Sequence, residues 1–149
     1  MPPRPTMDQL IELAEKKLDH AAQALATRNA RQRDAEAKLE LLVNYRVDYF
    51  SRFGSAAAAG IDNHLLHNFR AFMEKLDTAI TEQHAVVADA RSSVRAAQTA
   101  WQAEQQRLRS YQVLAERRRG NERVRNAKRE QREQDEHAAK VHVRNRASA

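Results

Sequence analysis

Apolar residues in the first third of the chain recur at alternating steps of three and four, the spacing of a coiled-coil helix. This seam runs from Ile11 to Phe53. Before it, Thr6 and Gln9 have the spacing of a capping box, and the prolines at positions 2, 3 and 5 cannot continue a helix backward. We therefore expect a first helix over about residues 7–53, roughly 65 Å long. Its seam includes three polar residues, a type that can fix helix register: Arg28, Gln32 and Arg46.

A second seam with the same spacing runs from Leu66 to Ala115. It predicts a second helix over about residues 61–143. Between the two, residues 54–60 are expected to form a turn, because Gly54 suits the left-handed position just past a helix end. Two long amphipathic helices joined by a short connection form an antiparallel helical hairpin.

A hairpin brings together residues whose numbers have a nearly constant sum, here about 118 if the turn is centred at 57–60 and short. The first helix then ends opposite the region near Tyr111, and the second helix overhangs at its C-terminal end from Glu116 to about Val143. Residues 144–149 are expected to be disordered. The facing residues are predicted as Leu42 with Leu76, Tyr45 with Phe72, Tyr49 with Phe69, and Ile11 with Arg107 and Leu108.

Composition agrees with this reading and excludes most others. The 149 residues include only 3 Gly and 3 Pro, too few to supply the turns of a sheet protein. The expected fold class is therefore all-α. Because the length allows only one domain, we expect a single antiparallel coiled-coil hairpin over residues 1–149.

Features of enzymes, metal sites and membrane proteins are missing from the sequence. Cysteine is absent, and there is no glycine-rich phosphate loop or catalytic histidine motif. His64 and His67 could share a metal, but without a third ligand they are better explained as solvated histidines. We expect no enzyme activity, cofactor, metal, signal peptide or membrane span, and a cytoplasmic location.

Charge is concentrated at the C-terminal end. Residues 116–149 hold 11 basic and 6 acidic side chains, which is +5 of the net +6. Three interpretations remain open for this overhang: nucleic-acid or acidic-lipid binding, a mixed-charge helix that contacts a protein partner, and a solvated tail. The interleaved acidic residues and the absence of aromatic residues for base stacking favour the protein partner.

Aromatic residues are concentrated near the predicted turn. Six of the seven Phe and Tyr residues lie between positions 45 and 72, and Tyr45, Phe50 and Phe72 lie off the seam. Because a two-helix hairpin buries only its seam well, off-seam aromatics indicate a partner-binding patch. The alternative is that they thicken the core near the turn.

Several of these patterns resemble the flagellar export FliJ family. The first is Leu42-x-x-Tyr45-Arg46-x-x-Tyr49, and the second is Asn68-Phe69 followed by Phe72-x-x-x-Leu76-x-x-Ala79-Ile80-x-x-Gln83. Trp101 with Leu114-Ala115-Glu116-Arg117, and the ending Glu130-Gln131 to Asp135-Glu136-x-Ala138, are also similar. The resemblance covers nearly the whole chain.

The resemblance implies a soluble stalk like that of rotary ATPases. The end with both termini would enter the hexameric flagellar export ATPase, and the turn end would reach the membrane export gate. Members also escort export chaperones, and such a protein is found at the cytoplasmic face of the inner membrane. The implied gate-binding patch is Leu42, Tyr45, Tyr49, Phe72, Leu76 and Ala79; Lys38 and Gln83 depart from the family pattern at its edges. The implied ATPase-binding region includes Leu18, Leu25, Leu108, Tyr111, Arg117, Arg118 and Arg125.

Two other functions remain alternatives. A basic coiled-coil protein could bind nucleic acid, although the residues do not favour it, and a stalk of a virulence type III secretion system would have a similar sequence. The free protein could be a monomer or could self-associate through the aromatic patch.

Overall fold

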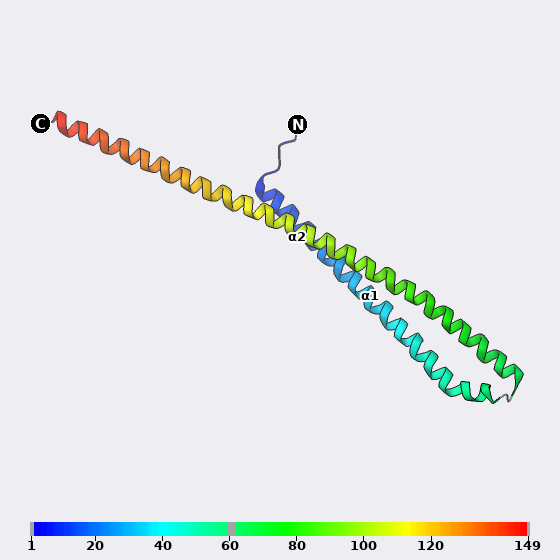
Figure 1. Ribbon diagram of the computed structural model, residues 1–149. Coiled ribbons are helices and arrows are strands. Elements are labelled where there is room, and N and C mark those ends of the chain that lie inside the picture. The colour runs from blue at the N-terminus through cyan, green and yellow to red at the C-terminus, as the bar shows by residue number, and fades with distance from the viewer. Residues whose placement is uncertain (1, 60–61, 149) are drawn as a thin grey trace. The chain divides into compact units, whose positions relative to one another are not determined.

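The computed structural model describes residues 2–59 and 62–148. Helix α1 spans Met7–Ala58 and helix α2 spans Asn63–Ala147, and no strand occurs among the described residues. The two long helices pack against each other, which confirms the predicted all-α class (Figure 1). Neither helix, as far as it is described, has an apolar stretch long enough to cross a bilayer.

The capping-box prediction is confirmed at the start of α1. The backbone N–H of Gln9 donates to Thr6 Oγ1 at 3.3 Å, and the backbone N–H of Thr6 donates to Gln9 Oε1 at 2.9 Å. At the start of α2, the backbone N–H of His64 donates to Asp62 Oδ1 at 2.9 Å. Both helices therefore begin with a side chain that satisfies a backbone donor left without a partner within the helix.

The predicted ends of both helices are wrong by several residues. Helix α1 continues past Gly54 to Ala58, because Gly54 keeps a helical backbone and alanines, the best helix formers, follow it. A Cβ on Gly54 would lie 3.4 Å from the Phe50 ring, an ordinary van der Waals contact, so this position within the helix does not require glycine. Gly60, at the predicted turn, lies outside the described residues.

The predicted disorder of residues 144–149 is also wrong as far as Ser148. Residues 144–147 form the last turn of α2, and the backbone N–H of Ser148 donates to the Arg144 carbonyl at 3.2 Å. No glycine or proline follows Gly120 to end the helix, and the basic Arg144 and Arg146 suit its C-terminal dipole.

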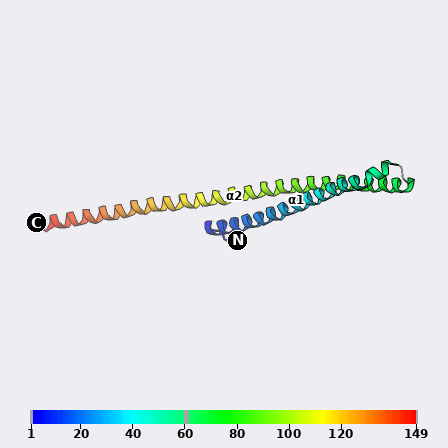
Figure 2. The ribbon, with the colours of Figure 1, turned by 90° about the horizontal axis from the view of Figure 1, so that it is seen from below.

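Contacts divide the chain into two compact units, one of which comprises residues 17–104. In this unit α1 and α2 lie side by side and antiparallel (Figures 1 and 2). Every predicted α2 seam position within it is buried or half-buried, whereas on α1 Arg28 and Phe53 are exposed. The core of this unit is therefore the predicted seam, with buried apolar side chains at Ala35, Met73, Leu76, Val87 and Val94.

The other unit comprises residues 1–16 and 105–149. Here the first turns of α1 lie beside α2, where Ala14 and Ala115 are buried. Ile11 shares a hollow with Gln112 and Ala115, about one turn further along α2 than predicted. From residue 121 to residue 148 every residue is exposed. We call this range, which includes the end of α2, the exposed segment.

Candidate functional site

Six aromatic residues near the connection form the tip cluster: Tyr45, Tyr49, Phe50, Phe53, Phe69 and Phe72. The rings meet across the hairpin as predicted, with Tyr45 edge-on to Phe72 at 5.9 Å between centroids and Tyr49 stacked on Phe69 at 5.6 Å. Tyr49 also contacts Phe53 at 4.9 Å and Phe72 at 4.5 Å. The aromatics thus pack on each other from both helices, and Tyr49 is the centre of the cluster.

The predicted patch residues differ in solvent exposure: five are at least partly exposed and one is buried. Tyr45 is 53% exposed, and Leu42, Tyr49, Phe72 and Ala79 are half-buried. Leu76 is only 6% exposed and belongs to the core. The cluster therefore thickens the core and also leaves ring surface exposed, and partner binding at that surface stays a prediction.

An apolar hollow beside the tip cluster was not predicted from the sequence. Its volume is about 220 Å³, enough for a large side chain. Leu65, one of its lining residues, is also among the exposed large apolar residues. The sequence features that could have indicated this hollow are the off-seam Leu65 and the alanines that continue α1 past Gly54. The hollow is lined by Tyr49, Phe53, Ala56, Ala57, Asp62, Leu65, Asn68 and Phe69.

Polar residues along the seam form a hydrogen bond and an ion pair between α1 and α2 near the patch. Gln83 is buried, and its Nε2 donates to the main-chain carbonyl of Ala35 at 2.9 Å. Arg46, a polar seam residue, pairs through Nε with Asp77 Oδ1 at 2.6 Å. Because a buried amide without a partner is costly, Gln83 favours the one register in which it reaches Ala35. Gln83 is therefore part of the hairpin's core and not of the exposed patch.

Glu36 is the centre of a second cross-helix contact. Its Oε1 accepts hydrogen bonds from Gln32 Nε2 at 3.1 Å and from Arg91 Nη2 at 3.0 Å. The hydrogen bond from Gln32 and then the one from Arg91 lower the pKa of the Glu36 carboxyl below its ordinary value of 4.5. This ion pair is partly exposed, so its contribution is small and depends on ionisation.

The residues predicted for ATPase binding fall in both units. Leu18 and Leu25 are half-buried seam residues of the unit over residues 17–104. In the other unit, Leu108 and Tyr111 are half-buried. Three predicted arginines are exposed: Arg117, Arg118 and Arg125.

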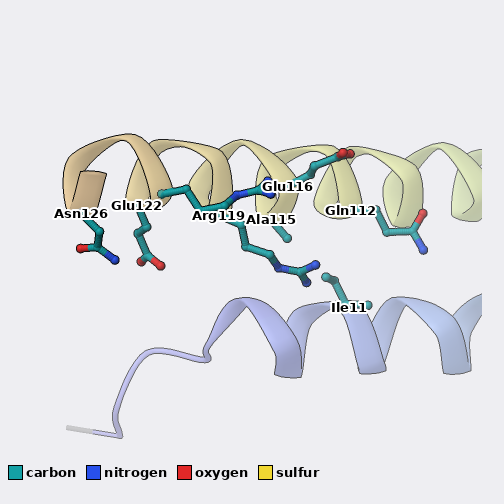
Figure 3. A pocket seen from close by; sticks show the side chains of 8 residues that line it. Ile11, Gln112, Ala115, Glu116, Arg119, Glu122 and Asn126 are labelled. Carbon is teal, nitrogen blue, oxygen red and sulfur yellow. The ribbon is translucent and has the colours of Figure 1, made fainter. Parts of the chain in front are cut away.

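A mixed-charge hollow lies where the first turns of α1 meet α2 (Figure 3). Ile11 comes from α1, and Gln112, Glu122 and Asn126 project from α2 toward the side on which α1 lies. Acidic and basic side chains alternate along this stretch of α2. The α2 residues that line the hollow are Gln112, Ala115, Glu116, Arg119, Glu122, Arg123 and Asn126.

The two histidines considered as metal ligands, His64 and His67, are exposed at the start of α2. Over the described residues, no group of three or more His, Cys, Asp or Glu side chains is placed to hold a metal ion. What the arrangement offers is contact surface, one aromatic and one charged.

Comparison with known proteins agrees with these features. The family model of the flagellar FliJ protein matches residues 3–147. The chain is 32% identical to the flagellar FliJ protein of Escherichia coli strain K12 over 108 residues, which is 72% of this chain and 74% of that protein. It is 27% identical to the flagellar FliJ protein of Salmonella typhi over 138 residues, which is 93% of this chain and 94% of that protein. Because the match spans nearly every residue of both helices, the chain belongs to the flagellar FliJ family.

Proposed function

We propose that this chain is the stalk of a flagellar export ATPase, inserting into the ATPase hexamer and contacting the membrane export gate. Membership of the FliJ family makes it a component of the flagellar protein export apparatus. It also favours the flagellar system over a virulence secretion system. The observation that carries the proposal is that two surfaces without an internal partner lie in separate parts of the chain: the open face of the tip cluster and the exposed segment.

The gate contact is assigned to the patch that includes Leu42, Tyr45, Tyr49, Phe72 and Ala79. Tyr45 offers an aromatic ring that is 53% exposed yet held in place by Phe72. Rings presented in this way are typical binding hot spots, since little side-chain entropy is lost when a partner covers them. Leu76 supports the patch from the core.

The gate contact is tested by binding of the purified chain to the cytoplasmic domain of the cognate export gate. Tyr45→Ala should weaken binding at least about tenfold, as expected for a hot spot. Val47→Ala is the matched control, since Val47 is 58% exposed on the same helix but lies off the patch. Equal binding by the two variants would contradict this assignment.

The ATPase contact is assigned to the charged end of the chain. Arg117, Arg118 and Arg125 are exposed on a stretch of α2 that also carries Glu116 and Glu122. A ring of six subunits could meet such a helix from several sides at once, so mixed charges can all find partners. Half-buried apolar residues would anchor the same contact: Leu18, Leu25, Leu108 and Tyr111.

The ATPase contact is tested by a pull-down with the cognate export ATPase. Replacing Arg117, Arg118 and Arg125 with Glu in the full chain should abolish capture at moderate salt, while Tyr45→Ala should leave it unchanged. A charge-reversed chain that is still captured would contradict the assignment.

Export chaperones are the third proposed class of partner, supported by family membership alone. Nucleic-acid binding is the second candidate function, favoured by the net charge of +5 on residues 116–149. It predicts affinity that falls steeply with salt. A gel shift at about 50 mM salt separates the two functions, because a stalk protein should give no shift.

A further inference from the structure

The exposed segment carries a stripe without charge. Residues 116–149 hold 11 basic and 6 acidic side chains, yet every position reached from Gly120 to Ser148 by alternating steps of four and three is uncharged. This is the spacing by which one helix packs on another in a coiled coil. All of these positions from residue 124 onward are exposed, so no other described part of the chain covers the stripe.

The central part of this stripe reads the same from both ends. In an antiparallel pair of identical helices, centred between residues 132 and 133, each residue would meet one of its own type from the second copy. Such a two-fold arrangement places the same surface on both partners. The facing pairs are Val124 with Val141, Ala127 with Ala138, and Gln131 with Gln134.

The two valines are the apolar part of this surface. Val124 is 56% exposed and Val141 is 40% exposed, and pairing would bury both at each end of a contact about 26 Å long. Burying apolar surface favours the pair. A polar helix without tertiary contacts is only marginally stable in water, so pairing would also stabilise the exposed segment itself.

The flanking charges select the antiparallel direction. Antiparallel pairing puts Lys128 of one copy beside Asp135 of the other, twice in the dimer. Parallel pairing puts Arg123 beside Lys128 and Glu130 beside Asp135, which are like charges. The antiparallel pair also brings Arg123 near Arg144 at its ends, but these side chains are exposed and screened by salt.

We propose that the exposed segment is a self-association surface on which a second copy of this chain packs in antiparallel orientation. The proposal rests on the symmetric stripe and on the charges beside it and not on the proposed function, although it uses the same segment as the proposed ATPase contact. It differs from self-association through the aromatic patch, because the tip cluster takes no part in it.

Cross-linking tests the pairing and its direction. The chain has no cysteine of its own, so single cysteines report only the designed contact. Ala127→Cys mixed with Ala138→Cys should give a mixed disulfide. Each variant alone should cross-link poorly, because a cysteine at either position would be about 17 Å along the axis from its copy, too far for a disulfide. Ala139→Cys, off the stripe, is the matched control for position 138.

Two cross-linking results would overturn the proposal. One is efficient cross-linking of Ala127→Cys to itself, which indicates a parallel pair. The other is a yield from Ala127→Cys with Ala138→Cys that is no higher than with Ala139→Cys.

Charge reversal tests the contact without a cross-link, by sedimentation equilibrium of the full chain. Lys128→Asp or Asp135→Lys should each weaken association about tenfold, because the reversed residue meets its like twice in the dimer. The double reversal should restore association, and Lys140→Asp, off the stripe, should have little effect. Because Gln131 Nε2 donates to Asp135 Oδ1 at 3.2 Å within the helix, circular dichroism checks that helix content is unchanged. A chain that stays monomeric up to about 1 mM, or a double reversal without rescue, contradicts the proposal.

Discussion

The tip cluster and the exposed segment show two different ways of presenting a surface to a partner. In the tip cluster the rings that face solvent also pack on each other, as Tyr45 does on Phe72. In the exposed segment every residue from 121 to 148 is open to solvent. Substitutions at the tip should therefore change stability and binding together, whereas substitutions in the exposed segment should change binding alone.

The largest expected effect on stability is at the buried residue of the predicted patch. Leu76→Ala removes a core side chain that is 6% exposed, and should lower the free energy of unfolding by about 2 to 5 kcal/mol. Val143→Ala, which is 66% exposed in the exposed segment and lies off the uncharged stripe, is the matched truncation and should stay within about 0.5 kcal/mol. Urea unfolding followed by circular dichroism measures both. Similar losses at the two positions would remove the distinction between the regions.

Sequence predicts those features of the fold that depend on helix geometry alone, and it misses those that depend on particular neighbouring residues. The heptad seam and the constant-sum rule placed Tyr49 opposite Phe69 correctly, because both depend only on helix geometry. The end of α1 was missed, because Gly54 continues the helix instead of capping it, and the alanines that follow favour helix. Whether a glycine ends a helix depends on its neighbours, which no single position specifies.

The candidate site was predicted only in part for the same reason. Period and composition located the aromatic patch, but they could not separate Tyr45 from the buried Leu76. Gln83 was noted as a polar seam residue at the edge of the patch, yet its bond to the Ala35 carbonyl depends on the exact register of the two helices. Register is set by the summed packing of both seams, which single positions do not report.

The second effect tests the centre of the tip cluster. Tyr49 contacts the rings of Phe53, Phe69 and Phe72, and aromatic pairs contribute about 0.5 to 1.5 kcal/mol each. Tyr49→Ala should therefore lower the free energy of unfolding by about 2 to 3 kcal/mol and also weaken gate binding. Tyr49→Phe keeps the ring and should retain most of the stability. If Tyr49→Ala left the free energy of unfolding unchanged, the ring contacts of Tyr49 would not contribute to stability, and the prediction would be wrong.

The third effect tests the register contact between the helices. Gln83→Ala removes the bond to the Ala35 carbonyl and some packing, and should cost about 1 to 2 kcal/mol. Gln83→Met restores the volume without the amide, so the difference between the two variants separates packing from hydrogen bonding. Urea unfolding at neutral pH gives both values. If Gln83→Met is as unstable as Gln83→Ala, the amide is the main contribution; if both match the wild type, Gln83 does not hold the register.

The smallest effect should come from Glu36, and it should depend on pH. Gln32 and Arg91 lower the pKa of the Glu36 carboxyl below 4.5 in the folded chain, so the folded state favours the ionised form. This stabilisation is complete above the unfolded-state pKa and is lost as the pH falls through the lower folded-state pKa. Glu36→Gln should therefore be slightly less stable than the wild type at pH 7, and the difference in stability should close as the pH falls through the lowered folded-state pKa. The control is Arg91→Leu, which removes the cationic partner of Glu36 and should reduce the difference between wild type and Glu36→Gln at pH 7. A gap for Glu36→Gln that stays constant with pH would place the contribution in helix packing and not in the ion pair with Arg91.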